Sequence, residues 1–440
     1  MKEKSSHYNE IYDYGEVPED KRVVKPRELF PIWFASNLTI GDFAVGFIPV
    51  IMGLNIYYTI ITLFAGTFFG SILLGIISIT GPRTGLPQMS AGKRAFGKKF
   101  GNFLSSLQWL NTIGWTTVNL VLAAFAFTLL FHVYSVISIL ILTAAIFLLS
   151  YAGHHVIAVF EKIMGIVLAF LFIFIILISF SKYSMISSYD PLNINYSVAI
   201  GITLAASFSD IISWTPYAGD YSRYTQDKKS VVPYVFFGSF SAAFVSEIAG
   251  MLVAILSLNP NGNPAIDMQI VLGKYSVFGL FALFLGGIAA DAINLYSNSL
   301  SLKVIGFKFK RSTVVIIGSI ITFLTAIITY SKFYLFYEDF LFILDYWITP
   351  WIGIIIADFF IINKNKKFSI INDYNKTGIT SYLIALMVSA PFMNPGFLYS
   401  GIISSMYLGG VDISYYISFI IAMLLYIGLR GHNNTLSQTA

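Results

Sequence analysis

The chain has 440 residues, 56% of them hydrophobic and only 11% charged. Ordinary soluble domains are roughly 25% charged, so this composition excludes a water-soluble fold. The net charge of +5 comes from basic residues in short segments between apolar runs, which excludes the continuous basic stripe of a nucleic-acid-binding protein. The absence of cysteine excludes disulfides and thiolate metal sites.

Apolar runs long enough to cross the hydrocarbon core of a lipid bilayer recur along the chain and predict an all-α polytopic membrane protein. Residues 1–28 carry many charges and no apolar core, so no cleavable signal peptide is expected. We predict twelve transmembrane helices, in the order 29–52, 56–79, 102–131, 134–152, 157–181, 197–217, 233–258, 276–300, 313–330, 339–362, 379–402 and 411–430.

The placement of lysine and arginine predicts the orientation of these helices. Of the basic residues, 24 fall on the side of the two termini and 3 on the other side. Basic residues concentrate in cytoplasmic segments, so both termini are predicted to be cytoplasmic, in a multi-pass protein of the cell membrane.

Two of the predicted helices are interrupted in similar ways. Residues 33–42 (WFASNLTIGD) in the first and 207–216 (SFSDIISWTP) in the sixth place small, polar and acidic residues at membrane depth. The two helices are five positions apart, so each half has an odd number of spans. Two halves built alike are then inserted upside down relative to each other, which is the inverted-repeat plan of secondary transporters. The predicted units are residues 1–28 (N-terminal tail), 29–181 (first repeat), 197–362 (second repeat), 379–430 (two peripheral helices) and 431–440 (C-terminal tail).

The third predicted helix carries a tryptophan and an amide on one face. Trp115 and Asn119 are four residues apart, and a flat indole beside an amide suits a planar heterocycle. The alternative is a structural one, in which tryptophan lies at the membrane interface and asparagine bridges two helices. Trp109, near the start of the span, fits that alternative better.

Acidic residues inside spans are costly in lipid and mark ion pathways or proton relays. The candidates are Asp42, Asp210, Glu247 and Asp291, the alternative for each being a structural pairing with a lysine or with backbone amides. Asp291 and Asn294 are three residues apart on the eighth helix, so both can face one cavity.

The sequence lacks the residues that an enzymatic function would need. Residues 92–99 (GKRAFGKK) resemble a phosphate-binding loop, but Lys99 replaces the hydroxyl residue that binds magnesium, and no strand precedes it. His154 and His155 lie at a cytoplasmic edge without a third ligand, so no metal site is predicted. Glu161 lies near a helix end and is expected to be solvated.

Three motifs resemble the nucleobase–cation symporter-1 family, and most closely its purine–cytosine permease branch. They are residues 81–88 (GPRTGLPQ), 213–224 (SWTPYAGDYSRY) and 294–297 (NLYS), the last followed by 300–302 (LSL). The resemblance implies a LeuT-type core of five plus five inverted helices with two peripheral helices. It also implies import of a nucleobase or a related heterocycle, such as cytosine, a purine, uracil, allantoin or a hydantoin.

The resemblance also implies a binding site in which the substrate lies between an aromatic of helix 3 and one of helix 6, with amides from helices 3 and 8. Trp115 matches the first aromatic, and Asn119 and Asn294 match the amides. Either Phe208 or Trp214 matches the second aromatic, with Phe208 preferred because it is expected to adjoin the break in helix 6. Further polar contacts are expected from the side chains of Asn37 and Ser209.

One departure from the family bears on the coupling ion. Sodium-coupled relatives carry hydroxyl side chains on helix 8, four to six positions before the asparagine, where this chain has residues 288–290 (IAA). No cofactor is expected beyond a coupling ion, H+ or Na+, and proton coupling through Asp210 or Asp291, with Asp42 as a further candidate, is the leading hypothesis.

The sequence therefore predicts a secondary active transporter that imports a heterocycle by cation symport with alternating access, and no enzymatic activity. Two alternatives remain: an amino-acid or vitamin permease of the same fold, or a channel. The individual heterocycle and the oligomeric state are left open.

Overall fold

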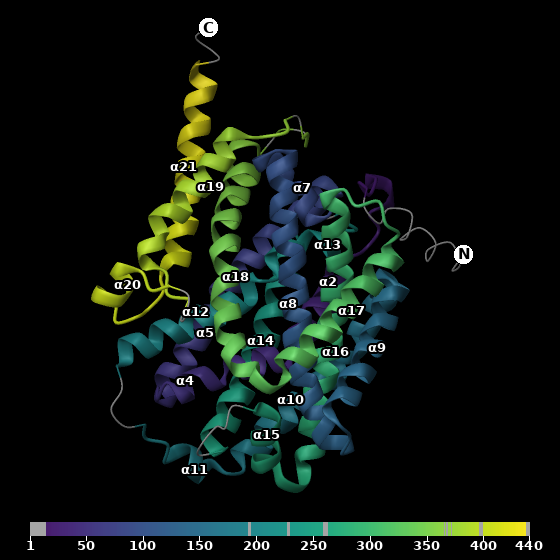
Figure 1. The fold of residues 1–440 in the computed structure, drawn as a ribbon, viewed down its shortest axis with the longest axis vertical. Helices are drawn as coiled ribbons and strands as arrows, with labels where there is room; N and C mark the ends of the chain where they lie inside the picture. The colour runs from purple at the N-terminus through teal and green to yellow at the C-terminus, as the bar shows by residue number, and fades with distance from the viewer. Residues whose placement is uncertain are drawn as a thin grey trace.

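The computed structural model of the protein describes residues 15–191, 195–226, 229–257, 263–364, 366, 368–370, 372–395 and 399–436. Within these residues the chain is helical, with a single isolated bridge between Val24 and Thr225 and no strand (Figure 1). The first 14 residues of the predicted N-terminal tail and the last four of the C-terminal tail lie outside the described residues.

The α-helices run as follows: α2 (Leu29–Ser36), α3 (Ile40–Val45), α4 (Phe47–Ile51), α5 (Ile56–Ser78), α6 (Thr80–Thr84), α7 (Gln88–Phe96), α8 (Lys98–Phe131), α9 (Ser135–Ala152), α10 (His154–Phe180), α11 (Tyr183–Ser187), α12 (Tyr196–Ile212), α13 (Ala218–Ser222), α14 (Val231–Ser257), α15 (Pro264–Leu272), α16 (Ser276–Ile305), α17 (Arg311–Thr329), α18 (Phe333–Ile356), α19 (Lys376–Ser389), α20 (Ile402–Tyr407) and α21 (Ser414–Leu436). Short 3-10 turns are η1 (Glu19–Lys21), η2 (Pro26–Glu28), η3 (Thr215–Tyr217), η4 (Gly273–Tyr275), η5 (Tyr330–Lys332) and η7 (Ala390–Phe392), and η6 (Ala357–Ile362) is a π-helix.

Each of the twelve predicted spans overlaps a helix. By length and apolarity, eight described helices can cross a membrane, or nine if the bent pair Pro26–Ser36 and Ile40–Ile51 counts as one span. Two further apolar helices, Tyr346–Ile362 and Ser414–Arg430, are shorter. The protein is therefore a multi-pass membrane protein, and the total of twelve spans stays a prediction.

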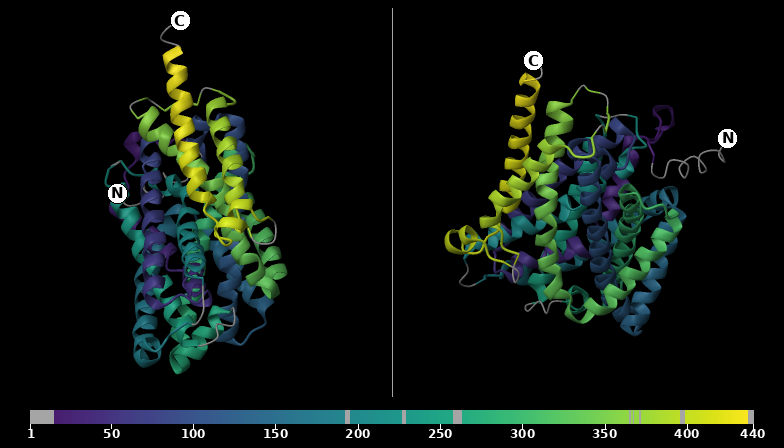
Figure 2. Two further views of the ribbon diagram at one scale, coloured as in Figure 1. Left: turned by 90° about the vertical axis from the view of Figure 1, so that its left-hand side faces the viewer. Right: turned by 45° about the horizontal axis from the view of Figure 1, so that its top comes forward.

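The molecule is a helical bundle with α19 and α21 on its outside. α16 packs along α8 through the centre, α12 packs on α5, and α14 covers α2, α3 and α5. α21 packs on α18 and α19, and all views show this C-terminal group on the outside of the bundle (Figures 1 and 2). α7 and the C-terminal part of α21 lie at the same end of the molecule (Figure 1).

The first predicted span is broken at residues 37–39, between α2 and α3, with a bend of 53°. We call this segment the helix-1 break. Close backbone contact holds α14 against α3, which follows the break. A Cβ added at Gly250 would collide with the carbonyl oxygen of Phe43, and one at Gly46 with that of Glu247. Only glycine allows the two helices to approach so closely.

We expect Gly250→Ala to lower the melting temperature of the purified protein by several degrees, because overpacking a tight contact costs roughly 1–3 kcal/mol. Gly428→Ala on α21 is the matched control, since a Cβ there meets nothing within 4 Å. The control should leave the melting temperature unchanged or slightly raised, as alanine favours a helix. Equal melting temperatures for the two variants would contradict the packing argument.

Candidate functional site

The helix-1 break is stabilised by the side chains that interrupt it. Asn37 ends α2 and donates from Nδ2 to the carbonyl of Trp33 at 2.7 Å. Thr39 begins α3, where its hydroxyl accepts from the backbone N–H of Asp42 at 3.2 Å and also bonds the Asp42 carboxyl. Side chains therefore satisfy part of the backbone that the break leaves without helical partners. The interruption predicted over residues 33–42 is confirmed.

The break in the sixth predicted span lies at the C-terminal end of the predicted interruption, residues 207–216. α12 continues to Ile212, and the chain then turns through η3, where Pro216 lacks the N–H that a continuing helix needs. Ser213 and Thr215 donate their hydroxyls to the carbonyls of Asp210 and Ile212, at 2.6 and 2.7 Å.

The expectation that Phe208 adjoins this break is wrong. Phe208 lies one turn inside α12, and its ring packs at 5.5 Å from that of Tyr416 on α21. It lines an apolar cavity of about 440 Å³ between α5, α12 and α21. The residue at the break is Trp214, so of the two aromatics considered for helix 6, Trp214 lies in the interrupted segment.

Side chains from α8, α16 and η3 form a buried hydrogen-bond network. Asn119 and Asn294 both donate from Nδ2 to Oδ1 of Asp291, at 3.2 and 3.3 Å. The Tyr217 hydroxyl donates to Oδ1 of Asn294 at 2.8 Å. All four side chains are at most 2% exposed. We call these four residues the central network. Sequence reasoning placed three of them together and missed Tyr217.

Trp115 lies beside the central network, one helical turn before Asn119. A Cβ added at Gly41, just after the helix-1 break, would lie 3.1 Å from Oδ1 of Asn119 and 3.7 Å from the Trp115 ring. The indole N–H of Trp115 and Oδ1 of Asn119 are buried without a hydrogen-bond partner. The site therefore holds a donor and an acceptor whose burial costs free energy until a partner satisfies them.

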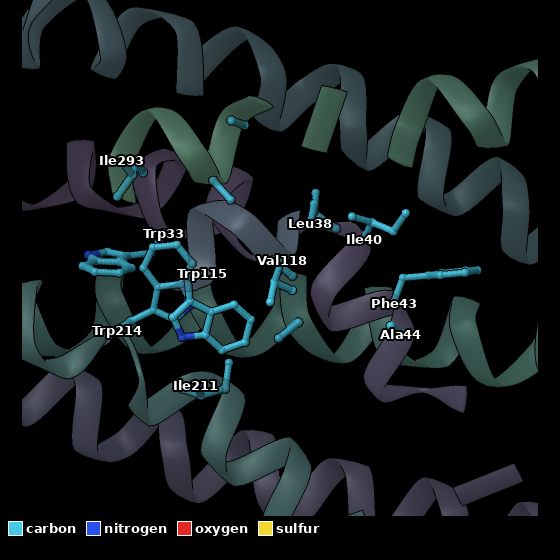
Figure 3. Packing of buried hydrophobic residues seen from close by; sticks show 14 of the residues in the cluster. Trp33, Leu38, Ile40, Phe43, Ala44, Trp115, Val118, Ile211, Trp214 and Ile293 are labelled. Atoms are coloured by element: carbon cyan, nitrogen blue, oxygen red, sulfur yellow. The ribbon is translucent and has the colours of Figure 1, made fainter. Parts of the chain in front are cut away.

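Three indole rings gather at this place. Trp33 and Trp214 pack edge to face with centroids 5.8 Å apart, and Trp214 lies 5.3 Å from the ring of Tyr217. Figure 3 shows Trp33, Trp115 and Trp214 within one packed cluster that also contains Leu38 of the helix-1 break and Ile40, the first residue of α3. The aromatic faces and the amides of the central network thus come from four different helical segments.

A second group of buried polar residues lies beside helix 1. Asp42 is within electrostatic reach of Asp210 and Glu247, and all three are at most 3% exposed. Glu247 accepts hydrogen bonds from the hydroxyls of Thr67 and Ser207, both at 2.7 Å. Within the described residues none of the three carboxyls forms an ion pair with a basic side chain. Burying close carboxyls without a basic partner costs free energy when they are ionised.

The remaining predicted residues have simpler surroundings. Oδ1 of Asn37 is buried without a partner, and Ser209 is fully buried on α12. The segment 288–290 on α16 is buried, and α16 meets the helix-1 break at Gly286, where a Cβ would lie 3.2 Å from Cα of Thr39.

The expectation that Glu161 is solvated is wrong, because its side chain is fully buried in α10. No group of three or more potential metal ligands occurs in the described part of the chain.

The three sequence motifs meet at the end of the molecule that bears α7. Gln88 of the first motif donates its backbone N–H to the carboxyl of Asp220 in the second at 2.8 Å. Its side-chain oxygen accepts from the N–H of Gly219 at 2.9 Å. The Tyr221 hydroxyl donates to the carbonyl of Ile293, next to the third motif, at 3.1 Å.

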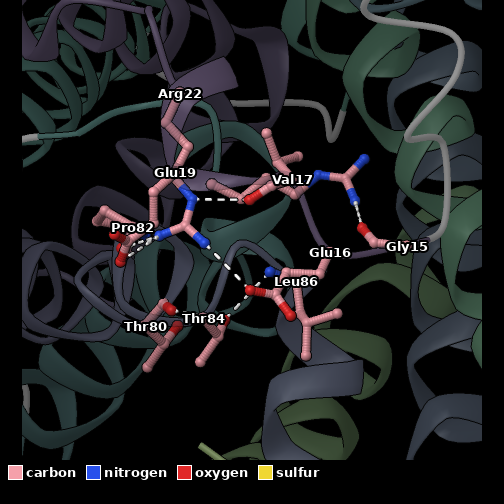
Figure 4. Close-up of polar contacts among 10 residues, drawn as sticks. Gly15, Glu16, Val17, Glu19, Arg22, Thr80, Pro82, Thr84 and Leu86 are labelled. Carbon is pink, nitrogen blue, oxygen red and sulfur yellow. Dashed lines mark hydrogen bonds and ion pairs between the residues drawn. The ribbon is translucent and has the colours of Figure 1, made fainter. Parts of the chain in front are cut away.

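The N-terminal residues 15–25, which we call the N-terminal clasp, cover these motifs. The Arg22 guanidinium is 3% exposed and donates to the carbonyls of Val17 and Pro82, at 2.8 and 2.9 Å (Figure 4). Val24 forms the isolated bridge to Thr225. The clasp thus ties the chain before helix 1 to the segments that follow α5 and α13.

Comparison with known proteins gives a consistent result. The family model described as permease for cytosine/purines, uracil, thiamine and allantoin matches residues 16–421. YxlA of Bacillus subtilis, a candidate purine–cytosine permease, is 27% identical over 93% of this chain and 93% of its own. The purine–cytosine permease fcyB of Emericella nidulans is 24% identical over 91% of this chain and 84% of its own.

Among solved structures, the chain resembles Mhp1, a nucleobase–cation symport-1 family transporter, in a closed conformation with bromovinylhydantoin bound. The TM-score is 0.77 at 19% sequence identity, over 94% of this chain and 93% of the other. The two proteins therefore share a fold.

Proposed function

Because the chain belongs to the family of permeases for cytosine and purines, uracil, thiamine and allantoin, we propose that it imports a nucleobase or a related heterocycle by cation symport with alternating access. The observation that carries this proposal is the central network, in which two amides and a carboxyl converge beside Trp115. Such a set of donors and acceptors at an aromatic face suits the polar edge and flat face of a heterocycle.

In the proposed complex the ring stacks on Trp115 and Trp214, and Asn119 and Asn294 bond its edge. The Asp291 carboxyl, which both amides contact, orients them. Asn37 and Ser209 are proposed to add polar contacts from the two interrupted helices. Phe208 is left out of the stacking pair because it faces α21.

The proposed architecture is a LeuT-type core of two inverted repeats, residues 29–181 and 197–362, with peripheral helices in 379–430. Its support is the bend of 53° in the first of the twelve predicted spans, the end of α12 at Ile212 within the sixth, and the outer position of α21. Both termini are proposed to be cytoplasmic, in the cell membrane, on the lysine and arginine distribution.

Protons are the proposed coupling ion. The support is the group of buried carboxyls, Asp42, Asp210 and Glu247, which lacks a basic partner within the described residues. Asp291 is a further candidate, because it lies in the central network. The segment 288–290 offers no side-chain oxygen, and a hard cation such as Na+ needs several oxygen ligands.

A vitamin permease of the same fold is the second candidate function, favoured by the presence of thiamine in the family description. An amino-acid substrate is less suited to the site, because its carboxylate would be placed near Asp291 without a cation to balance it. A channel would let substrate equilibrate and would not accumulate it against a gradient.

The test of the proposed function is ligand-induced thermal stabilisation of the purified protein. Nucleobases, allantoin, hydantoins and thiamine are added one at a time, with and without sodium and at two pH values. One heterocycle is expected to raise the melting temperature in a saturable way, because a ligand that binds only the folded state stabilises it. Stabilisation that depends on pH and not on sodium would support proton coupling.

Trp115→Ala should weaken the affinity for that heterocycle roughly 5- to 150-fold, the effect of losing about 1–3 kcal/mol of stacking. Trp109→Ala, which removes an indole from the same helix away from the central network, serves as the control and should leave the affinity close to that of the unmodified protein. If no compound stabilises the protein, or if both variants bind equally well, the proposed site is wrong.

A further inference from the structure

A cavity of about 200 Å³ opens at the end of the molecule that bears α7, away from the central network. Its charged lining consists of Lys93 and Arg94 on α7, Lys366 in the segment after η6, and Arg430 on α21. Asparagine side chains, including that of Asn372, complete the wall. We call it the basic cavity.

The carboxylate that pairs with Arg94 of the basic cavity already has several partners. Asp358, fully buried in η6, pairs with Nε of Arg94 at 2.6 Å. It also accepts hydrogen bonds from the Tyr426 hydroxyl and from Nδ2 of Asn363, at 2.8 and 2.6 Å. The negative charge of Asp358 is therefore balanced by Arg94. It does not balance the charges of the other cations of the cavity.

Those other cations are Lys93, Lys366 and Arg430. Within the described residues none of them forms an ion pair with a carboxylate. Lys93 Nζ donates instead to the backbone carbonyl of Val304 at 2.7 Å, which supplies a dipole but no charge. Three positive charges thus converge on a small cavity and repel one another.

One of the cavity's cations, Arg94, is nearly buried and a second, Lys93, is half-buried, which distinguishes them from ordinary basic residues at a cytoplasmic surface. The Arg94 side chain is only 10% exposed, and its Nη2 is buried without a hydrogen-bond partner. Burial, followed by the nearby charge of Lys98, lowers the pKa of Lys93 to about 8. Basic residues that only set topology would be solvated and would not carry this desolvation cost.

We propose that the basic cavity binds a phosphate group, either from a soluble phosphate compound or from the headgroup of an anionic lipid. A phosphate fits by charge, because a dianion offsets the unpaired cations, and by chemistry, because guanidinium and ammonium groups are the usual phosphate donors. It also fits by size, because a cavity of about 200 Å³ has room for about seven waters of roughly 30 Å³ each.

Binding there would connect parts of the chain that lie far apart in sequence. α7 precedes the central helix α8, whereas η6 and α21 belong to the C-terminal part of the bundle. A phosphate bridging Lys93 and Arg430 would therefore tie α7 to the peripheral helix α21. This inference does not depend on the substrate proposed above.

The experiment measures the melting temperature of the full-length purified protein. In one arm sodium phosphate is titrated against sodium chloride at constant sodium concentration, and choline chloride keeps the ionic strength constant. In the other arm nanodiscs of phosphatidylcholine are compared with nanodiscs containing phosphatidic acid. Stabilisation by phosphate identifies a soluble source, and stabilisation by phosphatidic acid alone identifies a lipid headgroup. Either result supports phosphate binding in the basic cavity if the variants below agree.

In the double variant Lys93→Gln with Arg430→Gln, the apparent affinity of the effective probe should fall at least tenfold. Lys308→Gln, which removes an exposed charge outside the cavity, is the matched control and should bind like the unmodified protein. If the double variant does not fold, Lys366→Gln, at an exposed lining residue, replaces it. The proposal is overturned if neither probe stabilises the protein, or if the cavity variants respond like the control.

Discussion

Substitution of Asn294 by alanine is expected to abolish uptake of the heterocycle while leaving the protein folded in the membrane. Asn294 links Asp291 to the Tyr217 hydroxyl, so its loss removes a proposed substrate contact and leaves two buried polar groups short of a partner. A site built from buried polar groups discriminates by roughly 10⁴-fold when a matching group is missing. The measurement is uptake of labelled substrate into proteoliposomes, with the amount of inserted protein determined in parallel.

Asn298→Ala is the control for this prediction. Asn298 lies one turn further along α16, where Nδ2 donates to the hydroxyl of Thr112 at 2.9 Å and to the carbonyl of Trp109 at 3.2 Å. These contacts join α16 to α8, so the variant should lose thermal stability and keep its substrate affinity. Normal uptake by the Asn294 variant, or equal loss of affinity in both variants, would refute the assigned role of Asn294.

Asp210→Asn is expected to abolish accumulation of substrate against its gradient while substrate exchange across the membrane continues. A proton entering down 100 mV supplies roughly 2.3 kcal/mol, enough for about 50-fold accumulation of a neutral substrate. An amide in place of this carboxyl cannot bind and release that proton, so the ratio of inside to outside substrate should fall to about one. Proteoliposomes with an imposed pH gradient or membrane potential measure both accumulation and exchange.

Two comparisons make the coupling prediction specific. Asp42→Asn changes the neighbouring carboxyl, which lies within electrostatic reach of Asp210, and shows whether the two carboxyls act together. A sodium gradient imposed at constant pH tests the other ion. Accumulation that persists in Asp210→Asn, or that follows sodium alone in the unmodified protein, would rule out proton coupling through Asp210.

The spans could be predicted because membrane insertion depends on local apolarity, which the sequence displays directly. The helix-1 break was also predictable, since Asn37 and Thr39 supply capping groups at the point where the helix stops. The interruption in helix 6 was predicted over residues 207–216, but the α-helix continues to Ile212 and the chain leaves it only near Pro216. Ser207, at the start of that range, donates to Glu247 of α14 at 2.7 Å while α12 continues.

Part of the site could be predicted because it depends on spacing within one helix. Asp291 and Asn294 share a face of α16, and their hydrogen bond confirms that interpretation. The partnership of Tyr217 with Asn294 joins residues 77 positions apart, and that of Glu247 with Thr67 joins residues 180 apart. Such contacts depend on how helices pack, and a single sequence carries no local pattern for them.

The N-terminal clasp has a consequence for the order in which the protein is made. Val24 pairs with Thr225, which leaves the ribosome about two hundred residues later. At about 5–20 residues per second, this delay lasts roughly 10–40 s. During that time residues 15–25 lack their final partner, and the helices up to α12 are synthesised. The clasp therefore closes only after the sixth predicted span has been made, as a late step in biogenesis.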